Sequence, residues 1–210
     1  LCAPAGNDIL FDDSLCEQGR NFCNKIWNCF RLIKGWEVAD NEMPATNQWG
    51  VEWFKAVLAK TQEEVADLFS KYRLSEALMA IYKLYCDEFS GWYLEIIKPA
   101  YGQPIDRATY EQTIQFMDTM LKLLHPFMPF ITEELWQAIE ERQEGESLMV
   151  SPLNAEQTLD KAAQLLENAT QCFDIISAIR NIRAQKNISP KEVLTLVAPS
   201  ELPAVVTKLA

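Results

Sequence analysis

Apolar residues recur at intervals of three and four along most of this 210-residue chain, and that spacing predicts a fold built mainly from helices. The first such stripe consists of Phe22, Ile26, Cys29 and Ile33. Acidic and hydroxyl residues at 12–14 are N-cap candidates ahead of it, and Gly35 suits a C-cap position behind it. We therefore predict a first helix that ends at about Lys34.

The same periodicity predicts four more helices after the first one. They are expected, in chain order, over residues 46–71, 74–97, 106–124 and a shorter stretch that starts at Thr132. Pro99 ends the second of these four, because proline cannot continue the helical hydrogen bonds. Two prolines within 125–129 break the chain before the last helix. Residues 1–146 are therefore predicted to form a five-helix bundle.

The C-terminal part of the chain, residues 147–210, shows a different pattern. Residues 147–150 and 193–197 predict two short strands. Residues 159–186, which lie between them, predict one long helix. The expected fold class is thus all-α, a helical bundle with a small α/β segment at its C-terminal end.

The sequence lacks the motifs of the common catalytic and cofactor-binding sites. It contains no G-x-G-x-x-G, P-loop, H-E-x-x-H or G-x-S-x-G pattern. His125 is the chain's one histidine, which leaves little room for a Ser-His-Asp or Cys-His arrangement. The six cysteines form no C-x-x-C pair, so we expect free thiols, no metal site and a reducing, cytoplasmic setting. Taken alone, the chain is predicted to be no enzyme and to hold no cofactor.

The start of the sequence is typical of the middle of a longer protein. It begins Leu1-Cys2-Ala3-Pro4, with neither an initiator methionine nor the layout of a signal peptide. We therefore expect a piece of a larger polypeptide. No apolar run reaches the ~18 residues that a membrane-spanning helix needs, so no membrane partner is expected.

The charge of the chain is uneven. Its formal net charge of −11 counts against indiscriminate binding of nucleic acid. Residues 18–36, however, contain four basic residues and no acid, and residues 161–191 contain five basic residues against two acids. A phosphate-binding surface is therefore expected to be built from these two segments.

Two helix faces gather side chains that suit RNA. On the first helix these are Arg20, Asn24, Asn28 and Arg31. An asparagine amide can hydrogen-bond the edge of an unpaired base, and an arginine can hold a phosphate or stack on a base. On the long C-terminal helix they are Arg180, Arg183 and Lys186. A solvated helix face is the alternative for the first set, and favourable placement of cations near a helix C-terminus is the alternative for the second.

Six segments resemble the anticodon-binding domain of class I aminoacyl-tRNA synthetases, in the group of the valine, isoleucine and leucine enzymes. They are APAGNDI at 3–9, GRNFCNKIWN at 19–28, YRLSEAL at 72–78, WYLE at 92–95, HPFMPFITEELW at 125–136 and IRNIRA at 179–184. The first and the last of them point to the valyl-tRNA synthetases within this group. The resemblance extends from residue 3 to about residue 197.

The resemblance implies a domain that binds the anticodon stem-loop of valine tRNA. It implies that Asn24 and Asn28 contact anticodon bases. The other tRNA-binding candidates are Arg20, Lys25 and Arg31, as contacts to the RNA backbone, together with Arg180, Arg183 and Lys186.

The resemblance also implies a parent enzyme, a valine–tRNA ligase, whose catalytic domain lies in the same polypeptide and uses ATP. The family's HIGH-type and KMSKS-type ATP motifs and its editing domain are absent from this sequence. Two alternatives remain open. One is the equivalent domain of an isoleucine or leucine enzyme, and the other is a helical scaffold that docks on a catalytic body or on another protein.

Overall fold

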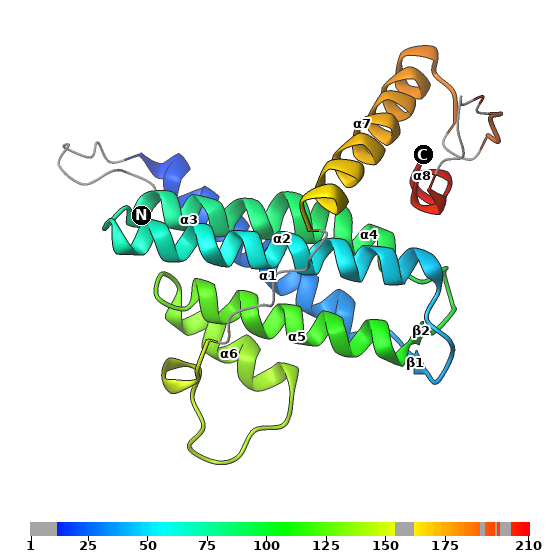
Figure 1. The fold of residues 1–210 in the computed structure, drawn as a ribbon. Coiled ribbons are helices and arrows are strands. Elements are labelled where there is room, and N and C mark those ends of the chain that lie inside the picture. Colours follow the sequence, from blue (N-terminus) through cyan, green and yellow to red (C-terminus); the bar gives the residue numbers. More distant parts are fainter. Residues whose placement is uncertain (1–11, 154–161, 190–191, 196, 198–202) are drawn as a thin grey trace.

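Helices dominate this protein in a computed structural model that describes residues 12–153, 162–189, 192–195, 197 and 203–210 (Figure 1). In chain order they are α1 (Asp13–Lys34), α2 (Ala45–Ser70), α3 (Leu74–Lys83), η1 (Leu84–Tyr93), α4 (Leu94–Ile97), α5 (Arg107–Leu124), α6 (Pro129–Ile139), η2 (Leu148–Val150), α7 (Ala162–Lys186) and α8 (Ala204–Leu209). Two short strands are β1 (Val38–Ala39) and β2 (Ile105–Asp106). The predicted helical bundle is confirmed. Within the described ranges, no helix combines the length and apolar character needed to cross a membrane.

The bundle is arranged around α2. Figure 1 shows α2 crossing the centre, with the run from α3 to α4 along one side and α5 along the other. The helix α6 packs on α5, and α1 packs against α6 and η1. This arrangement places α1 beside η1, although the two are far apart in the sequence.

The first helix, α1, has the predicted bounds. Its N-cap Asp12 accepts a hydrogen bond from the backbone N–H of Ser14 at 2.8 Å, and its C-cap Gly35 donates to the carbonyl of Arg31. The four residues of the predicted apolar stripe are buried, with exposed fractions of 0–7%. Burial of that stripe leaves the polar residues of α1 on the opposite side, where a ligand can reach them.

The predicted helix over residues 74–97 is observed as one continuous helical run with a π-helical middle, η1. It ends before Pro99, as predicted. The wider turn of η1 is not indicated by the sequence periodicity, and π-helical turns often occur at functional positions. Three aromatic residues of η1 are at most 1% exposed and face the centre of the bundle, namely Tyr85, Phe89 and Tyr93.

Aromatic rings fill the centre of the bundle between α2, η1 and α5. Phe54 of α2 is fully buried, and its ring centroid lies 4.8–5.3 Å from those of Phe89, Tyr93 and Phe116. Burial of this apolar surface is the main stabilising contribution to such a core. The core therefore holds η1, which carries one wall of the site described below.

A buried polar network lies where β1 and β2 meet. The strands pair in parallel, with Val38 opposite Ile105, and two-residue strands are too short for any periodicity to predict. Asp106 caps α5 by accepting from the backbone N–H of Thr109 at 2.8 Å, and it also accepts from the Asn47 amide at 3.1 Å. The predicted start of α5 at this aspartate is confirmed.

The helix α6 begins at Pro129, three residues before the predicted start at Thr132. Proline suits the first turn, because the N–H that it lacks would have no helical partner there. The Thr132 hydroxyl donates to the carbonyl of Met128 at 2.8 Å and lies 2.7 Å from Nδ1 of His125. Thr132 therefore joins the end of α5 to the first turn of α6 instead of capping the helix.

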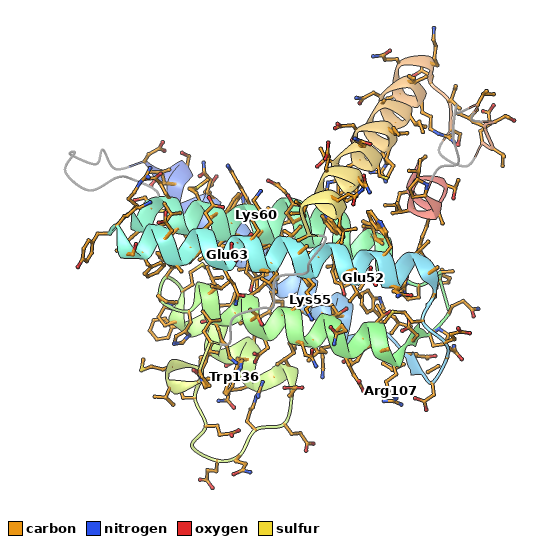
Figure 2. All side chains as sticks on the ribbon, viewed as in Figure 1. Glu52, Lys55, Lys60, Glu63, Arg107 and Trp136 are labelled. Carbon is orange, nitrogen blue, oxygen red and sulfur yellow. The ribbon has the colours of Figure 1, made fainter. Side chains whose placement is uncertain are left out.

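Trp136 fixes α6 to α5. Its indole Nε1 donates to the Asp118 carboxylate of α5 at 2.6 Å. In the view of Figure 2, Trp136 lies below α5, and Arg107 marks the opposite end of that helix. The guanidinium of Arg142 lies 3.8 Å from the centroid of the Trp136 ring, so the segment after α6 is held by the same cluster.

The two strand predictions in the C-terminal part are wrong. Residues 148–150 form the 3₁₀ turn η2, with Ser147 as its N-cap, and the N–H of Leu148 donates to the carboxylate of Glu133 on α6 and not to a neighbouring strand. The described residues within 193–197 lie in no strand. The last described residues form α8 instead. The predicted division of the chain at residue 146 stays a prediction.

The long helix α7 ends at Lys186, as predicted, and it packs against α2. Its predicted first residues, 159–161, lie outside the described residues. The ring of Phe173 on α7 lies 4.1–6.2 Å from the rings of Trp49, Trp53 and Trp92. Figure 1 shows α7 leaving the bundle obliquely above α2, with α8 beside it.

Candidate nucleic-acid interface

A groove of about 320 Å³ runs between α1 and the helical run η1–α4. On the α1 side it is lined by Asn21, Asn24, Lys25, Asn28, Cys29 and Leu32. On the other side it is lined by Ser90, Leu94 and Glu95. Cys29 and Leu94 are buried and give the groove an apolar base, while its polar side chains stand on both walls.

Three asparagines of α1 line this groove. Asn24 and Asn28, the two predicted base contacts, line it together with Asn21. All three residues are exposed, and no side chain or backbone group in the described ranges hydrogen-bonds their amides. Each amide therefore keeps its donors and its acceptor for water or a ligand.

Asn21 and the opposite wall of the groove are not among the residues predicted from the sequence. Asn21 precedes Asn28 by seven residues, which is two helical turns, so helical spacing was a sufficient signal for it. Ser90 and Glu95 had no such signal, because nothing local in the sequence shows which helix packs beside α1. Only the packing of η1 and α4 reveals them.

The outer face of α1 carries two arginines and an exposed aromatic ring. Arg20 and Arg31 are exposed and do not line the groove. Neither guanidinium has a hydrogen-bond or ion-pair partner among the residues that the structure describes. Trp27 lies between them along α1, is 38% exposed and has its ring centroid 5.9 Å from that of Phe30. A ligand strand that follows α1 would therefore meet free cations on both sides of this ring.

Lys25 lines the groove, but its ammonium already has a partner in the protein. Its Nζ donates to the backbone carbonyl of Cys86 at 3.2 Å in a partly buried position. That carbonyl belongs to η1, so the bond joins the two walls of the groove. Lys25 is thus a structural link, and its predicted contact with the RNA backbone stays a prediction.

Arg180, from the second basic set, does not line this groove and binds the protein's own backbone. Its Nε and Nη2 donate to the carbonyl of Leu209 at 3.1 and 2.8 Å. Its guanidinium carbon also lies 5.7 Å from the ring centroid of Trp92. These contacts attach α8 to α7 and to the bundle.

Arg183 has a similar role one turn later. Its Nη1 donates to the carbonyls of Ser189 and Glu192, both at 2.9 Å. Lys186 is exposed in the last turn of α7 and has no partner in the described part of the chain. The structure therefore uses the two arginines to hold the residues after α7, and a contact of this basic set with tRNA stays a prediction.

The base of the groove carries no ionised group at neutral pH. Burial raises the pKa of the Cys29 thiol, against the opposing effects of a hydrogen bond with Ser90 and the charge of Lys25. In the described ranges, no group of three histidine, cysteine or acidic side chains could hold a metal ion. The groove thus offers hydrogen-bonding groups over an uncharged base.

Comparison with known proteins decides the family. A family model described as the anticodon-binding domain of tRNA ligase matches residues 51–198. The chain belongs to this family. The matched range includes η1 and α4, which form one wall of the groove, while α1 precedes it in this anticodon-binding domain.

Close relatives of this anticodon-binding domain are valine–tRNA ligases. The chain is 65% identical over 196 residues to the valine–tRNA ligase of Phocaeicola vulgatus, with 93% of the chain and 22% of that enzyme covered. It is 61% identical over 206 residues to that of Bacteroides thetaiotaomicron, with 97% and 23% covered. It is 46% identical over 192 residues to that of Christiangramia forsetii, with 91% and 22% covered.

The chain therefore spans less than a quarter of the length of the relatives that it matches. Coverage of 97% in the second comparison leaves out fewer residues than the 22 of α1. The likeness therefore includes α1 as well as the opposite wall of the groove.

Proposed function

We propose that this domain recognises the anticodon stem-loop of valine tRNA as part of a valine–tRNA ligase. The observation that carries the proposal is the groove beside α1, where three asparagine amides have no partner in the described chain. The relatives of 46–65% identity are valine–tRNA ligases, which favours valine tRNA over isoleucine or leucine tRNA as the ligand.

Asparagine amides suit the unpaired bases of an anticodon loop. Each amide offers a donor and an acceptor in one plane, and the bases of an RNA loop can be splayed so that their edges are accessible. Valine anticodons share A in the middle position and C in the last, so these are the bases expected in the groove. Arg20 and Arg31 would then meet phosphates of the loop, which makes the affinity fall as the salt concentration rises.

The net charge of −11 restricts where RNA can bind. Acidic residues elsewhere on the molecule repel phosphates, while residues 18–36 carry four basic residues and no acid. The exposed face of α1 is therefore the favoured surface for RNA binding. Binding of RNA by the domain alone is expected to be weak and sensitive to salt.

In the whole ligase, the domain would place the tRNA so that its acceptor end reaches the active site. We assign the ATP-dependent joining of valine to tRNA to a catalytic domain elsewhere in the same polypeptide. We place the protein in the cytoplasm, where aminoacylated tRNA is used. The chain matches 22–23% of the length of its relatives. The remaining length of those ligases is ample for a catalytic domain.

Binding of the chain to a labelled valine anticodon stem-loop, measured by fluorescence anisotropy at two salt concentrations, tests this function. The double variant Asn24→Ala, Asn28→Ala is expected to bind roughly 30-fold more weakly or worse, since it loses two base contacts that cost ~1–3 kcal/mol each. Asn168→Ala changes an exposed asparagine of α7 outside the groove and should leave the affinity unchanged. Equal affinity of the double variant and the wild type would contradict the proposal.

A docking scaffold is the second candidate function. It is favoured by another groove, of about 630 Å³, which lies between α2, α3, η1 and α7 and is lined by both charged and aromatic side chains, including Glu88, Trp92 and Phe173. This function predicts that the chain does not bind the stem-loop in the same assay.

A further inference from the structure

The wall of the groove that faces α1 carries one acidic side chain, Glu95 of α4. It lines the groove together with the α1 asparagines. In the described part of the chain its partner is Lys98, whose Nζ lies 3.5 Å from Oε1, and both side chains are 48% exposed. Such a loose surface pair holds the carboxylate weakly, so Glu95 can exchange this partner for a ligand.

The asparagines alone cannot select the bases that the proposed function requires. A half-turn of an asparagine amide exchanges its donor and its acceptor, so it can pair with a base of either pattern. Adenine and cytosine present an exocyclic amine beside a ring nitrogen that accepts. Guanine and uracil present a carbonyl oxygen beside a ring N–H. A group of fixed polarity is needed to separate the two classes, and a carboxylate is such a group because it only accepts.

We propose that Glu95 is a specificity-determining residue of the anticodon groove. Its carboxylate accepts a hydrogen bond from the exocyclic amine of an unpaired adenine or cytosine, while an asparagine of α1 donates to the neighbouring ring nitrogen. A guanine or uracil in the same position would place a carbonyl oxygen against the carboxylate, where two acceptors repel. This inference rests on the proposed function, and it identifies the ligand class of the groove as bases that carry an amine.

The hydrogen bond proposed for Glu95 also explains why an acidic residue can lie in an RNA-binding groove. A carboxylate near phosphates weakens binding of every sequence alike, whereas its hydrogen bond strengthens binding of amine-bearing bases only. Glu95 therefore raises selectivity at the expense of affinity. Replacing it should have opposite effects on the two quantities, which no merely structural residue would produce.

The proposal is tested by measuring the affinity of the 210-residue chain for three stem-loops. One has the valine anticodon, one has inosine in place of the middle A, and one has U in place of the last C. Each replacement changes an exocyclic amine into a carbonyl. Wild-type protein should bind the valine stem-loop about tenfold more tightly than at least one of the replaced forms. Glu95→Gln should reduce that ratio by roughly fivefold or more, because a glutamine amide can turn to donate to the carbonyl.

Glu76→Gln is the matched control. Glu76 is 52% exposed, pairs with Arg73 three residues away as Glu95 does with Lys98, and does not line this groove. The Glu76→Gln variant loses the same charge as Glu95→Gln, so it reports the general electrostatic effect. It should keep the wild-type ratio of affinities for the valine stem-loop and the replaced forms. Circular dichroism confirms that both variants are folded.

The outcomes separate the two proposals. An unchanged ratio in Glu95→Gln overturns the role of Glu95 and leaves the proposed function standing. Wild-type protein that binds no stem-loop, or binds all three equally, overturns both. A lower ratio in Glu95→Gln but not in Glu76→Gln supports both.

Discussion

At the scale of single residues, Trp27 is the exposed tryptophan of this domain. All six tryptophans are described, and Trp27 is the one that leaves more than a third of its surface in water. Exposure of an indole ring to water is unfavourable, and Phe30 covers only part of the Trp27 ring. Trp27 lies one helical turn from Asn24 and from Arg31. A ring in that position suits the stacking of an unpaired base beside the groove.

Trp27→Ala is therefore expected to weaken binding of the valine anticodon stem-loop by roughly 5- to 100-fold, because base stacking on an aromatic ring contributes ~1–3 kcal/mol. Trp27→Phe keeps an aromatic surface and should retain most of the affinity. Phe130→Ala removes a ring that is 90% exposed on α6 and should have no effect. Fluorescence anisotropy gives the dissociation constants, and equal values for Trp27→Ala and Phe130→Ala would remove Trp27 from the interface.

Glu88 of η1 is a partly buried acid that the proposed function does not use. Burial raises its pKa above the ordinary 4.5, repulsion from Asp87 adds to this, and the charge of Lys60 opposes it. Lys60 lies on α2 (Figure 2). Since the folded pKa of this acid lies above the unfolded value, both states are protonated at low pH and the group costs nothing there. The cost appears as the pH rises through the folded pKa.

Glu88→Gln should therefore stabilise the domain at pH 7, by roughly 1–3 °C in Tm. The gain should disappear as the pH falls below 4.5, the ordinary value for this side chain. Differential scanning fluorimetry across a series of pH values measures it. Glu167→Gln, on the exposed side of α7, is the control and should show no such dependence. A gain that does not change with pH would mean that packing, and not charge, explains it.

At the scale of elements, the packing of α2 against α4 depends on Gly50. A Cβ at this position of α2 would lie 2.7 Å from Cγ2 of Ile96 on α4, a side chain that is fully buried. A β-branched side chain in a helix cannot rotate away easily, so the two helices would have to separate. Because α4 carries Glu95, this contact also positions one wall of the groove.

Gly50→Ala is expected to lower the free energy of unfolding by about 1–3 kcal/mol, despite the better helix propensity of alanine. Urea denaturation followed by circular dichroism measures the change. Gly19→Ala is the matched control in α1, where nothing lies within 4 Å of the added Cβ, and it should stabilise the protein by up to ~1 kcal/mol. A Gly50→Ala protein as stable as Gly19→Ala would show that the two helices have room to spare.

The helices that could be predicted from the sequence are those whose ends are marked by local signals. The bounds of α1 and α5 follow from local signals, since a capping aspartate precedes each helix and apolar residues recur along it. The start of α6 was missed because Thr132 resembles a cap, whereas Pro129 already fits the first turn. The turn at 147–150 depends on Glu133, which no local pattern links to it.

The groove could be predicted only on one side. Asn24 and Asn28 share a helix with their neighbours, so spacing placed them on one face, and the structure places both in the groove. Glu95 belongs to a segment whose position beside α1 depends on tertiary packing. Glu95 was thus missed, whereas Arg180 was predicted to be available for RNA although its guanidinium donates to the carbonyl of Leu209. Long-range contacts therefore decide both the second wall and which cations remain available.

At the scale of the whole molecule, the arginines of the two basic segments differ in their contacts. The chain has a net charge of −11, and its two basic segments serve different ends. Arg20 and Arg31 on α1 have no partner in the described ranges, whereas Arg180 and Arg183 on α7 bind backbone carbonyls. Phosphate binding should therefore depend on α1, and the arginines of α7 should matter for stability.

The salt dependence of stem-loop binding tests this division. Each phosphate contact adds about 0.7–0.9 to the slope of log affinity against log salt concentration. Arg20→Ala and Arg31→Ala should each reduce the slope by about that amount, because each removes one free cation from the α1 face. Arg180→Ala should leave the slope unchanged but lower the stability by ~1 kcal/mol or more, since it loses two hydrogen bonds to Leu209. If Arg180→Ala reduced the slope instead, the RNA would have to reach α7 and displace α8 on binding, and the interface would extend beyond the groove.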